Sequence, residues 1–228
     1  MARGGAGAIF SLRRELAVAL GVYALYLLVG RVVVRRNGRA RGRLNAERIV
    51  ALEKTLGLHV EPALQRRLVG ARRLVHGLNL GYAVFNVGLT VGWLVRLYRR
   101  RDPEYHAVRR ACVLAHVGAQ PVFLWFPTAP PRGLDGFVDT LSEISGLDLE
   151  HPLLVRFYNP LAAMPSLHVA YAVVTGSAIA ARTRSRTVRA AARGYAPLVA
   201  LVVTATGNHY VLDSVAGAAL GGAARRLA

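Results

Sequence analysis

Residues 165–181 read PSLHVAYAVVTGSAIAA, and residues 207–213 read GNHYVLD. The first stretch is a run of apolar and small residues that opens with a proline, a serine and a histidine. The second stretch places a histidine at the start of another apolar run, with an aspartate four residues later. Ionisable side chains at the edge of a membrane span are costly, and those that occur there are functional candidates by default. His168, His209 and Asp213 are therefore the first candidates for a catalytic site.

The composition of the chain indicates one integral membrane domain over residues 1–228. Hydrophobic residues make up 54% of the sequence, and the mean hydropathy of +0.33 is too high for an ordinary soluble domain of this length. The formal net charge of +18 comes from 30 Lys and Arg residues against 12 Asp and Glu residues. The basic residues lie in clusters between apolar runs. We therefore expect anionic membrane lipids as partners and no nucleic acid.

Apolar runs of membrane-spanning length predict an all-α, polytopic membrane protein with about six transmembrane helices. The expected spans cover residues 16–34, 74–95, 107–126, 165–181, 194–206 and 210–224. Residues 44–72 alternate apolar and charged side chains at helical spacing, with interruptions near Gly57 and Pro62. Such a pattern is typical of an amphipathic helix that lies on the membrane surface. Cys112 is the only cysteine, so no disulfide forms within the chain.

The order of the spans places both histidines at one face of the membrane. If all the spans cross, the loop 127–160 and the turn 207–209 lie on the same side. The Lys and Arg residues are nearly balanced between the two sides, so the positive-inside rule hardly distinguishes the two orientations. We place the active site on the extracytoplasmic face of the cell membrane. The sequence does not specify an oligomeric state.

The start of the fourth span is suited to binding phosphate. Pro165 is expected at the first position of the helix, where its missing N–H group is not needed. The free N–H groups of the first turn would then point out of a helix end that carries partial positive charge and binds phosphate. The hydroxyl group of Ser166 can donate a further hydrogen bond.

His209 and Asp213 are separated by about one helical turn, so we expect them to share a helix face. Asp213 can accept a hydrogen bond from one imidazole nitrogen, which leaves the other nitrogen with a lone pair. A single histidine at a membrane edge is more often an ordinary interfacial residue. Two histidines and an aspartate at one face are instead sufficient for covalent phosphoryl transfer, with one histidine as nucleophile and the other as acid.

A third stretch, FPTAPPRG at residues 126–133, follows the third span. Its prolines stiffen a turn that holds Arg132 at the same mouth. A guanidinium group there can bind phosphate oxygens in a bidentate manner and stabilise charge in the transition state. An ordinary interfacial arginine is the alternative interpretation.

Together, the blocks at residues 126–132, 165–168 and 209–213 resemble the signature motifs of the type 2 phosphatidic acid phosphatase (PAP2) superfamily. They are most similar to its inositolphosphotransferase-like branch, which includes the inositol phosphorylceramide synthases. The resemblance covers residues 110–222, which we take as the catalytic core. It implies a metal-independent enzyme that works through a phosphohistidine.

The resemblance also implies a role for each matching residue. His209 would be the nucleophile, Asp213 would orient it, and His168 would act first as general acid and then as general base. Ser166 and Arg132 would bind phosphate. No cofactor and no metal would be needed, and the sequence has neither an HExxH motif nor clustered carboxylates at metal-ligand spacing.

Two cations of the phosphatase branch are missing from this chain. That branch has a lysine before the arginine of the first motif and an arginine before the histidine of the third, where Trp125 and Val203 stand here. A terminal phosphate carries close to two negative charges, whereas a diester carries one. The missing cations therefore favour a diester substrate, unless Arg72, Arg73 or Arg156 replaces them.

Four polar residues are candidates for binding the hydroxyl groups of a sugar or inositol headgroup. Asn79 lies on the second span, and Asp135, Asp139 and Asn159 lie in the loop 127–160. For Asn79, a hydrogen bond between helices is at least as good an explanation.

Two glycine pairs, Gly88 with Gly92 and Gly217 with Gly221, have the GxxxG spacing of closely packed membrane helices. Small residues at this spacing let two helix backbones approach each other. Because glycine is common in membrane helices generally, a packing role and no role are equally good interpretations of each pair.

We expect an enzyme that cleaves a lipid phosphate or phosphodiester and transfers the phosphoryl or phospho-alcohol group to the hydroxyl group of an alcohol acceptor. One alternative is a lipid phosphate or polyprenyl-phosphate phosphatase, in which water is the acceptor. Another is a non-catalytic lipid-binding or transport protein. Binding alone needs no nucleophile with an orienting carboxylate, so the combination of His168, His209 and Asp213 favours an enzyme.

Overall fold

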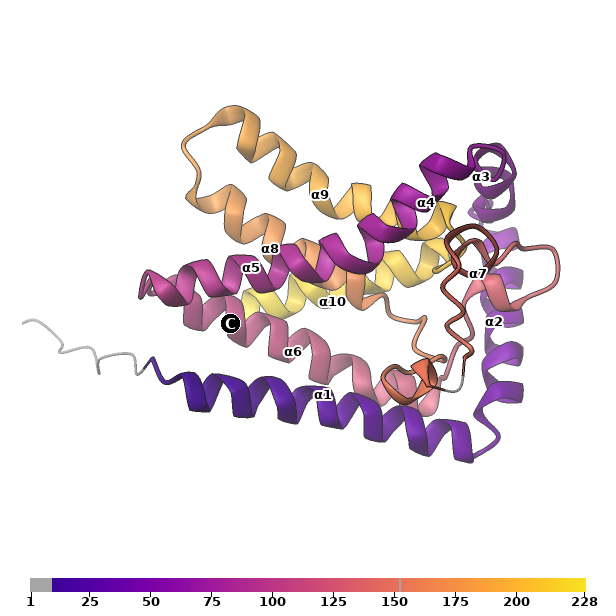
Figure 1. The fold of residues 1–228 in the computed structure, drawn as a ribbon, viewed down its shortest axis with the longest axis horizontal. Coiled ribbons are helices and arrows are strands. Elements are labelled where there is room, and N and C mark those ends of the chain that lie inside the picture. The colour runs from indigo at the N-terminus through magenta and orange to yellow at the C-terminus, as the bar shows by residue number, and fades with distance from the viewer. Residues whose placement is uncertain (1–9, 152) are drawn as a thin grey trace, which may run out of the picture.

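The computed structural model describes residues 10–151 and 153–228, and the fold is all-α, as the sequence predicts (Figure 1). Ten α-helices lie within these residues. Long helices occur at every position where a span is expected, and the largest shift is at α9, which begins before residue 194. They are α1 (Leu12–Arg35), the continuous run of α4 (Arg72–Leu80), the π-helix η1 (Gly81–Phe85) and α5 (Asn86–Arg99), α6 (Glu104–Trp125), α8 (Leu167–Arg182), α9 (Arg186–Ala205) and α10 (Val211–Leu227).

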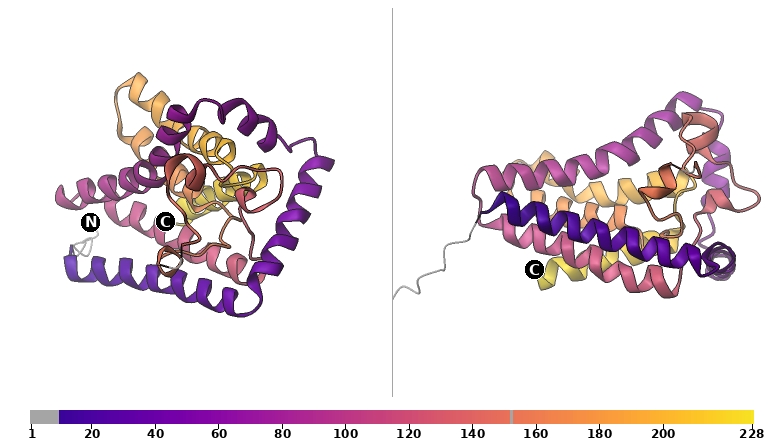
Figure 2. Two further views of the ribbon diagram at one scale, coloured as in Figure 1. Left: turned by 45° about the vertical axis from the view of Figure 1, so that its right-hand side comes forward. Right: turned by 60° about the horizontal axis from the view of Figure 1, so that its bottom comes forward.

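The region 44–72 forms two helices rather than one, α2 (Gly38–Thr55) and α3 (Glu61–Leu68). Gly57 adopts a positive φ of 68° between them, a conformation that glycine tolerates best. Pro62 lies in the first turn of α3, where proline is well accommodated. In Figure 1, α2 crosses one end of the bundle instead of running along it, and the right-hand view of Figure 2 shows it nearly end-on. We call this end of the bundle the site end.

Helices α2 and α3 hold the loops of the site end in place. The Asn45 side chain donates a hydrogen bond to the carbonyl oxygen of Pro127 at 2.9 Å, and the N–H group of Ala129 donates to the carbonyl oxygen of Gly42 at 3.1 Å. The Gln65 amide on α3 makes two hydrogen bonds to the backbone of Val138, at 2.8 and 2.9 Å. The loop that follows α6 is therefore fixed by the two helices that cross the end of the bundle.

The centre of the bundle depends on close packing of α8 against α10. A Cβ atom at Gly217 would lie 2.2 Å from the carbonyl oxygen of Ser166, and one at Gly221 would lie 2.5 Å from that of Ala170. A Cβ atom at Gly88 would have open space around it. Of the two GxxxG pairs, the pair on α10 therefore mediates helix packing, whereas the pair on α5, Gly88 with Gly92, does not.

Two helices expose apolar stripes, and most of their members line a cavity of about 440 Å³ between α1, α5 and α6. The stripes recur every four residues, which is the spacing of one helix face. The sequence predicts about six membrane spans, whereas two helices of the described residues, α1 and α9, are by themselves long and apolar enough to cross a membrane. Exposed apolar stripes of this length mark contact with a membrane or a partner protein. Their members are Leu12, Leu16 and Leu20 on α1, and Val87, Val91 and Val95 on α5.

Candidate active site

The three sequence motifs meet at the site end around a small cavity of about 110 Å³, which we call the catalytic cavity. The loop after α6 contributes Arg132, the first turn of α8 contributes His168, and the turn before α10 contributes Asn208 and His209. The aromatic side chains of Tyr26, Tyr82 and Tyr158 also line it. The convergence expected from the order of the helices is therefore observed.

His209 is oriented through its Nδ1 atom. This nitrogen lies 2.9 Å from the carbonyl oxygen of Ala163 and 3.3 Å from Oδ2 of Asp213. Both partners can only accept a hydrogen bond if Asp213 is ionised, so Nδ1 carries the proton and Nε2 keeps the lone pair. The Ala163 carbonyl, which no sequence motif indicated, is the nearer of the two orienting groups.

Asp213 reaches His209 in a different way from the one we expected. Helix α10 begins at Val211, so His209 lies in the preceding turn and does not share a helix face with Asp213. Asp213 instead folds back over the helix start, where its Oδ2 atom accepts the N–H group of Tyr210 at 3.0 Å. The carboxylate therefore caps the helix and contacts the imidazole at the same time.

The surroundings of His209 keep its imidazole neutral at neutral pH. Burial lowers the pKa of His209 to about 3, an effect that the hydrogen bond to the Ala163 carbonyl opposes and the Arg132 guanidinium reinforces. In the free protein, the lone pair on Nε2 is therefore available at physiological pH.

His168 faces the same cavity from the first turn of α8. Its ring centroid lies 5.7 Å from that of His209 and 4.6 Å from that of Tyr82. The side chain of Asn86 donates a hydrogen bond to the His168 carbonyl oxygen at 3.0 Å. The two imidazoles are therefore neighbours within one site.

The helix α8 begins at Leu167, two residues later than the start at Pro165 that the sequence predicts. Ser166 caps the helix through its hydroxyl oxygen, which accepts the N–H group of Val169 at 3.4 Å, and Pro165 lies outside the helix. Ser166 is fully buried and does not line the catalytic cavity in the described structure. The side chain that was expected to bind phosphate is engaged in shaping the helix end.

Arg132 is held by the turn that carries His209. Its Nη1 atom donates to Oδ1 of Asn208 at 2.6 Å, and its backbone N–H group donates to the carbonyl oxygen of Gly207 at 2.9 Å. Gly207 adopts a positive φ of 73°, which favours glycine at this turn. Asn208 is not among the residues that the motifs predict for the site, and its position next to His209 is the one signal in the sequence that indicates it.

A family model described as the PAP2 superfamily matches residues 47–227. The chain belongs to the PAP2 superfamily. Members are typically metal-independent phosphatases or transferases that act on phosphate esters, and they are often membrane-bound. The match begins well before residue 110, where the resemblance of the motifs begins, and therefore includes the second half of α2 and all of α3. No curated protein and no solved structure matched the chain.

Among the four candidates for headgroup binding, Asn159 lines the catalytic cavity of this PAP2 protein. Its Oδ1 atom accepts the N–H group of Leu161 at 3.0 Å. Its Nδ2 atom is buried and has no hydrogen-bond partner among the described residues. A buried amide nitrogen without a partner can donate a hydrogen bond to a ligand.

The other three candidates lie outside this cavity. Asn79 donates hydrogen bonds to Thr140 and Ser145, both at 2.8 Å, so it joins α4 to the short helix α7 (Thr140–Ser145). Asp139 caps α7, and Asp135 is exposed and forms an ion pair with Arg43 at 2.5 Å. These contacts give each of the three residues a structural role, so a role in binding a headgroup is not needed to account for them.

The three candidate replacements for the missing cations, Arg72, Arg73 and Arg156, do not line the catalytic cavity in the described structure. Arg72 donates a hydrogen bond to the carbonyl oxygen of Glu143, and Arg156 lines a separate cavity beside α1. Within the described structure, Arg132 is the one Lys or Arg residue that lines the catalytic cavity. The PAP2 site thus has a single guanidinium for phosphate.

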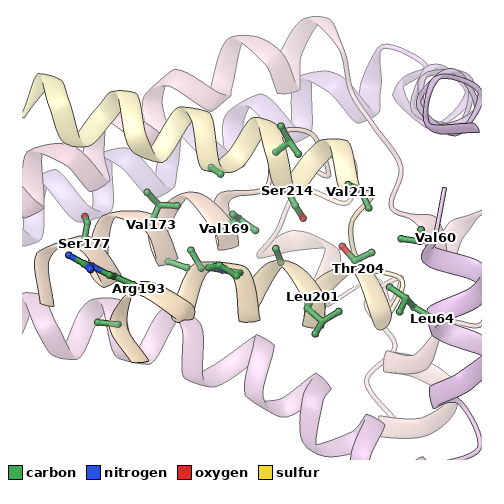
Figure 3. A pocket seen from close by; sticks show the side chains of 17 residues that line it. Val60, Leu64, Val169, Val173, Ser177, Arg193, Leu201, Thr204, Val211 and Ser214 are labelled. Atoms are coloured by element: carbon green, nitrogen blue, oxygen red, sulfur yellow. The ribbon is translucent and has the colours of Figure 1, made fainter. Parts of the chain in front are cut away.

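A larger cavity of about 640 Å³ lies between α8, α9 and α10 (Figure 3). Its lining is almost entirely apolar and includes Val169, which follows His168, together with Val173 and Leu201. Ser214, which follows Asp213, also lines it. The cavity therefore runs behind the helix ends that carry the candidate catalytic residues.

Two glutamates that the motifs did not indicate hold the first turn of α10 from the other side. Oε1 of Glu53 accepts the N–H group of Leu212 at 2.7 Å, and Oε1 of Glu61 accepts that of Val211 at 2.9 Å. Both glutamates are fully buried. They accept hydrogen bonds from N–H groups that have no partner within the helix. The two carboxylates also lie close together in space, although the sequence has no carboxylates clustered at metal-ligand spacing.

Proposed function

We propose that this PAP2 protein is a membrane-embedded enzyme that cleaves a lipid phosphate ester through a phosphohistidine at His209 and passes the group to an acceptor hydroxyl. The observation that carries this proposal is the environment of His209. Its Nδ1 atom donates to two acceptors, so the lone pair is on Nε2. His209 lines a cavity that His168 and Arg132 also line.

In the first step of the proposed reaction, Nε2 of His209 attacks the phosphorus atom. An N–P bond forms, the P–O bond to the leaving alcohol breaks, and His168 donates a proton to the leaving oxygen. Asp213 and the Ala163 carbonyl stabilise the positive charge that develops on the imidazole of His209. Arg132 stabilises the charge on the phosphate oxygens.

In the second step, an acceptor hydroxyl attacks the phosphohistidine. His168, now neutral, takes the proton of the acceptor, a new P–O bond forms, and the N–P bond breaks to regenerate His209. The reaction balances without a metal, because Arg132 and the N–H groups at the start of α8 compensate the phosphate charge.

The exposed apolar stripes on α1 and α5 support a location in the membrane. We propose that the six long helical segments cross the bilayer and that α2 and α3 lie at its surface on the extracytoplasmic side. The basic clusters next to α1 and α5 would then contact anionic lipid headgroups. The apolar cavity between α8, α9 and α10 is a suitable place for an alkyl chain of the substrate.

The single guanidinium of the catalytic cavity supports a phosphodiester as substrate. One cation balances the one negative charge of a diester, whereas a terminal phosphate carries close to two. The unpartnered amide of Asn159 can bind a hydroxyl group of the transferred alcohol. These two features favour the inositolphosphotransferase-like reaction over simple hydrolysis.

The alternative reaction is hydrolysis of a lipid phosphate or polyprenyl phosphate, with water as the acceptor. The narrowness of the catalytic cavity, about 110 Å³, is the observation that favours it, because a water molecule enters such a space more easily than inositol. The two reactions share the phosphohistidine and differ only in the second step.

The experiment that tests the proposal uses the purified protein with phosphatidic acid, a prenyl diphosphate and phosphatidylinositol, each with and without added inositol or a lipid alcohol acceptor. Mass spectrometry would measure free phosphate and new phosphodiesters, and acid-labile phosphoenzyme would be trapped in parallel. We expect the diester to react faster and the acceptor alcohol to raise turnover. Release of phosphate from phosphatidic acid with no effect of alcohols would establish hydrolysis instead, and no turnover of any substrate would refute both reactions.

A further inference from the structure

A second cluster of ionisable side chains lies behind the first turn of α10. It consists of Glu53 near the end of α2, His59 in the connection to α3, and Glu61 at the start of α3, and we call it the Glu–His–Glu cluster. Each glutamate uses its Oε1 atom for a backbone N–H group of α10. No residue of the cluster lines the catalytic cavity in the described structure.

Three atoms of the cluster converge and have no hydrogen-bond partner in the part of the chain that the structure describes. They are Oε2 of Glu53, Oε2 of Glu61 and Nδ1 of His59, and all three are buried. Nδ1 of His59 lies 3.2 Å from Oε2 of Glu61 and 3.9 Å from Oε2 of Glu53. All three atoms lie within 4.8 Å of one another. Buried polar atoms in native proteins are nearly always satisfied, so this convergence calls for a ligand.

The charges of the cluster indicate a divalent cation as that ligand. No Lys or Arg side chain forms an ion pair with Glu53 or Glu61 among the described residues, and both carboxylates are fully buried. A protonated His59 would supply one positive charge to two carboxylates. A divalent cation bound by two carboxylates and a neutral imidazole makes the cluster neutral, and buried charges require such compensation.

We propose that Glu53, His59 and Glu61 bind a divalent transition-metal ion, with Zn²⁺ as the best fit. One imidazole nitrogen and two carboxylate oxygens are ligands that zinc accepts, whereas calcium and magnesium prefer oxygen alone. Neighbouring ligand atoms of tetrahedral zinc lie about 3.4 Å apart. Nδ1 of His59 and Oε2 of Glu53, which are 3.9 Å apart, must therefore approach each other when the ion binds. His59 is partly exposed and can turn toward the carboxylates.

A fourth ligand and an entry route are available on the outer side of the cluster. His59 lines an open cavity of about 580 Å³ between α2, α3 and the loop at residues 134–137. Water from this cavity can occupy the remaining coordination position. The metal would join α2 and α3 to the helix turn that carries Asp213, so it would stabilise the site end without contacting the phosphate. This role goes beyond the proposed reaction, which needs no metal.

The test measures metal binding by the full-length protein, purified without chelator. Metal content would be determined by mass spectrometry, and the stripped protein would be titrated with Co²⁺, whose absorption spectrum reports its ligands, and then with Zn²⁺ as competitor. We expect one metal ion per chain and a Tm that rises with Zn²⁺ concentration. His59→Gln should weaken Co²⁺ binding at least ~10-fold and remove the effect on Tm.

The matched control is Glu47→Gln. Glu47 also lies on α2 and lines the same open cavity, but it is exposed and pairs with Arg43. It should bind Co²⁺ as the wild type does. Absence of a cobalt spectrum in the wild type, or unchanged Co²⁺ binding in His59→Gln, would overturn the proposal. Protons on the cluster would then compensate its charge in place of a metal ion. Because the readouts are metal content and Tm, a failure of the phosphotransfer assay would not affect this result.

Discussion

The first turn of α10 separates two polar clusters that are built in opposite ways. On one side, His209 has two acceptors at Nδ1, and Arg132 is paired with Asn208. On the other side, Glu53 and Glu61 each bind one backbone N–H group, and their second oxygens have no partner among the described residues. The first cluster lines the catalytic cavity, whereas the unpartnered atoms of the second converge on one another, with His59 at the edge of an open cavity.

This difference shows how hydrogen bonding directs reactivity. When one nitrogen of a buried imidazole is fully bonded, its other nitrogen is fixed in position and in protonation state, which suits a nucleophile. When several buried acceptors converge without donors, the arrangement is stable only with a bound cation or proton. One helix start can therefore support both a reactive group and a binding site.

The largest expected loss of activity is that of His209→Ala, which removes the proposed nucleophile. Turnover and acid-labile phosphoenzyme should both fall below detection, because alanine has no nitrogen that can form a bond to phosphorus. His151→Ala is the matched control, since His151 is an exposed histidine in the loop before α8. Phosphoenzyme that persists in His209→Ala would contradict covalent catalysis at this residue.

Asp213→Asn should lower kcat on the order of 10³-fold, because an orienting carboxylate that stabilises an imidazolium has effects of this size. The Ala163 carbonyl still accepts from Nδ1, so some activity should remain, unlike in His209→Ala. Steady-state kinetics would measure the loss, and a thermal unfolding curve would show whether the fold is kept. A wild-type kcat in this variant would mean that the carbonyl alone orients His209.

Arg132→Ala should lower kcat roughly 100-fold, in the range found for loss of one group that stabilises transition-state charge. Arg156→Ala provides the comparison, because Arg156 lines another cavity and should leave kcat unchanged. Equal losses in the two variants would mean that general surface charge, and not the paired guanidinium, is important. Kinetics with a diester substrate would distinguish these results.

Gly217→Ala tests whether close helix packing holds the catalytic side together. The added Cβ atom would lie 2.2 Å from the Ser166 carbonyl oxygen, so α8 must move. We expect a loss of about 1–3 kcal/mol in the free energy of unfolding, as for other overpacked sites. Gly88→Ala has open space and should be neutral or slightly stabilising. Thermal unfolding in one detergent would compare the two variants.

Of the expected effects, the smallest is the change in kcat/KM that protonation of His209 causes as the pH falls. Because burial lowers the pKa of His209 to about 3, its neutral form persists as the pH falls from 7 to 5. Of the groups around it, Arg132 stays charged, Asp213 is bonded to Nδ1, and His168 is needed in its acidic form. We therefore expect no acid limb in kcat/KM that arises from His209 above about pH 4. An acid limb near pH 6.5 that disappears in Asp213→Asn would contradict this assignment.

The local sequence determined the helices and the family. Apolar runs satisfy their backbone groups internally when they form helices, and each of the six runs corresponds to a helical segment in the structure. The order of these helices also placed His168 and His209 at one end of the bundle. Helix starts were less predictable, because Ser166 can cap α8 only if Pro165 lies outside the helix.

The tertiary structure decided which polar residues meet. Asn159 lines the catalytic cavity and Asn79 does not, although both were candidates for the same role. The Glu–His–Glu cluster depends on contacts between α10 and residues about 150 positions earlier, such as the hydrogen bond from Val211 to Glu61. Helical periodicity specifies neighbours within a few turns. Contacts between distant helices depend instead on how close packing, such as that at Gly217, sets the position of one helix against another.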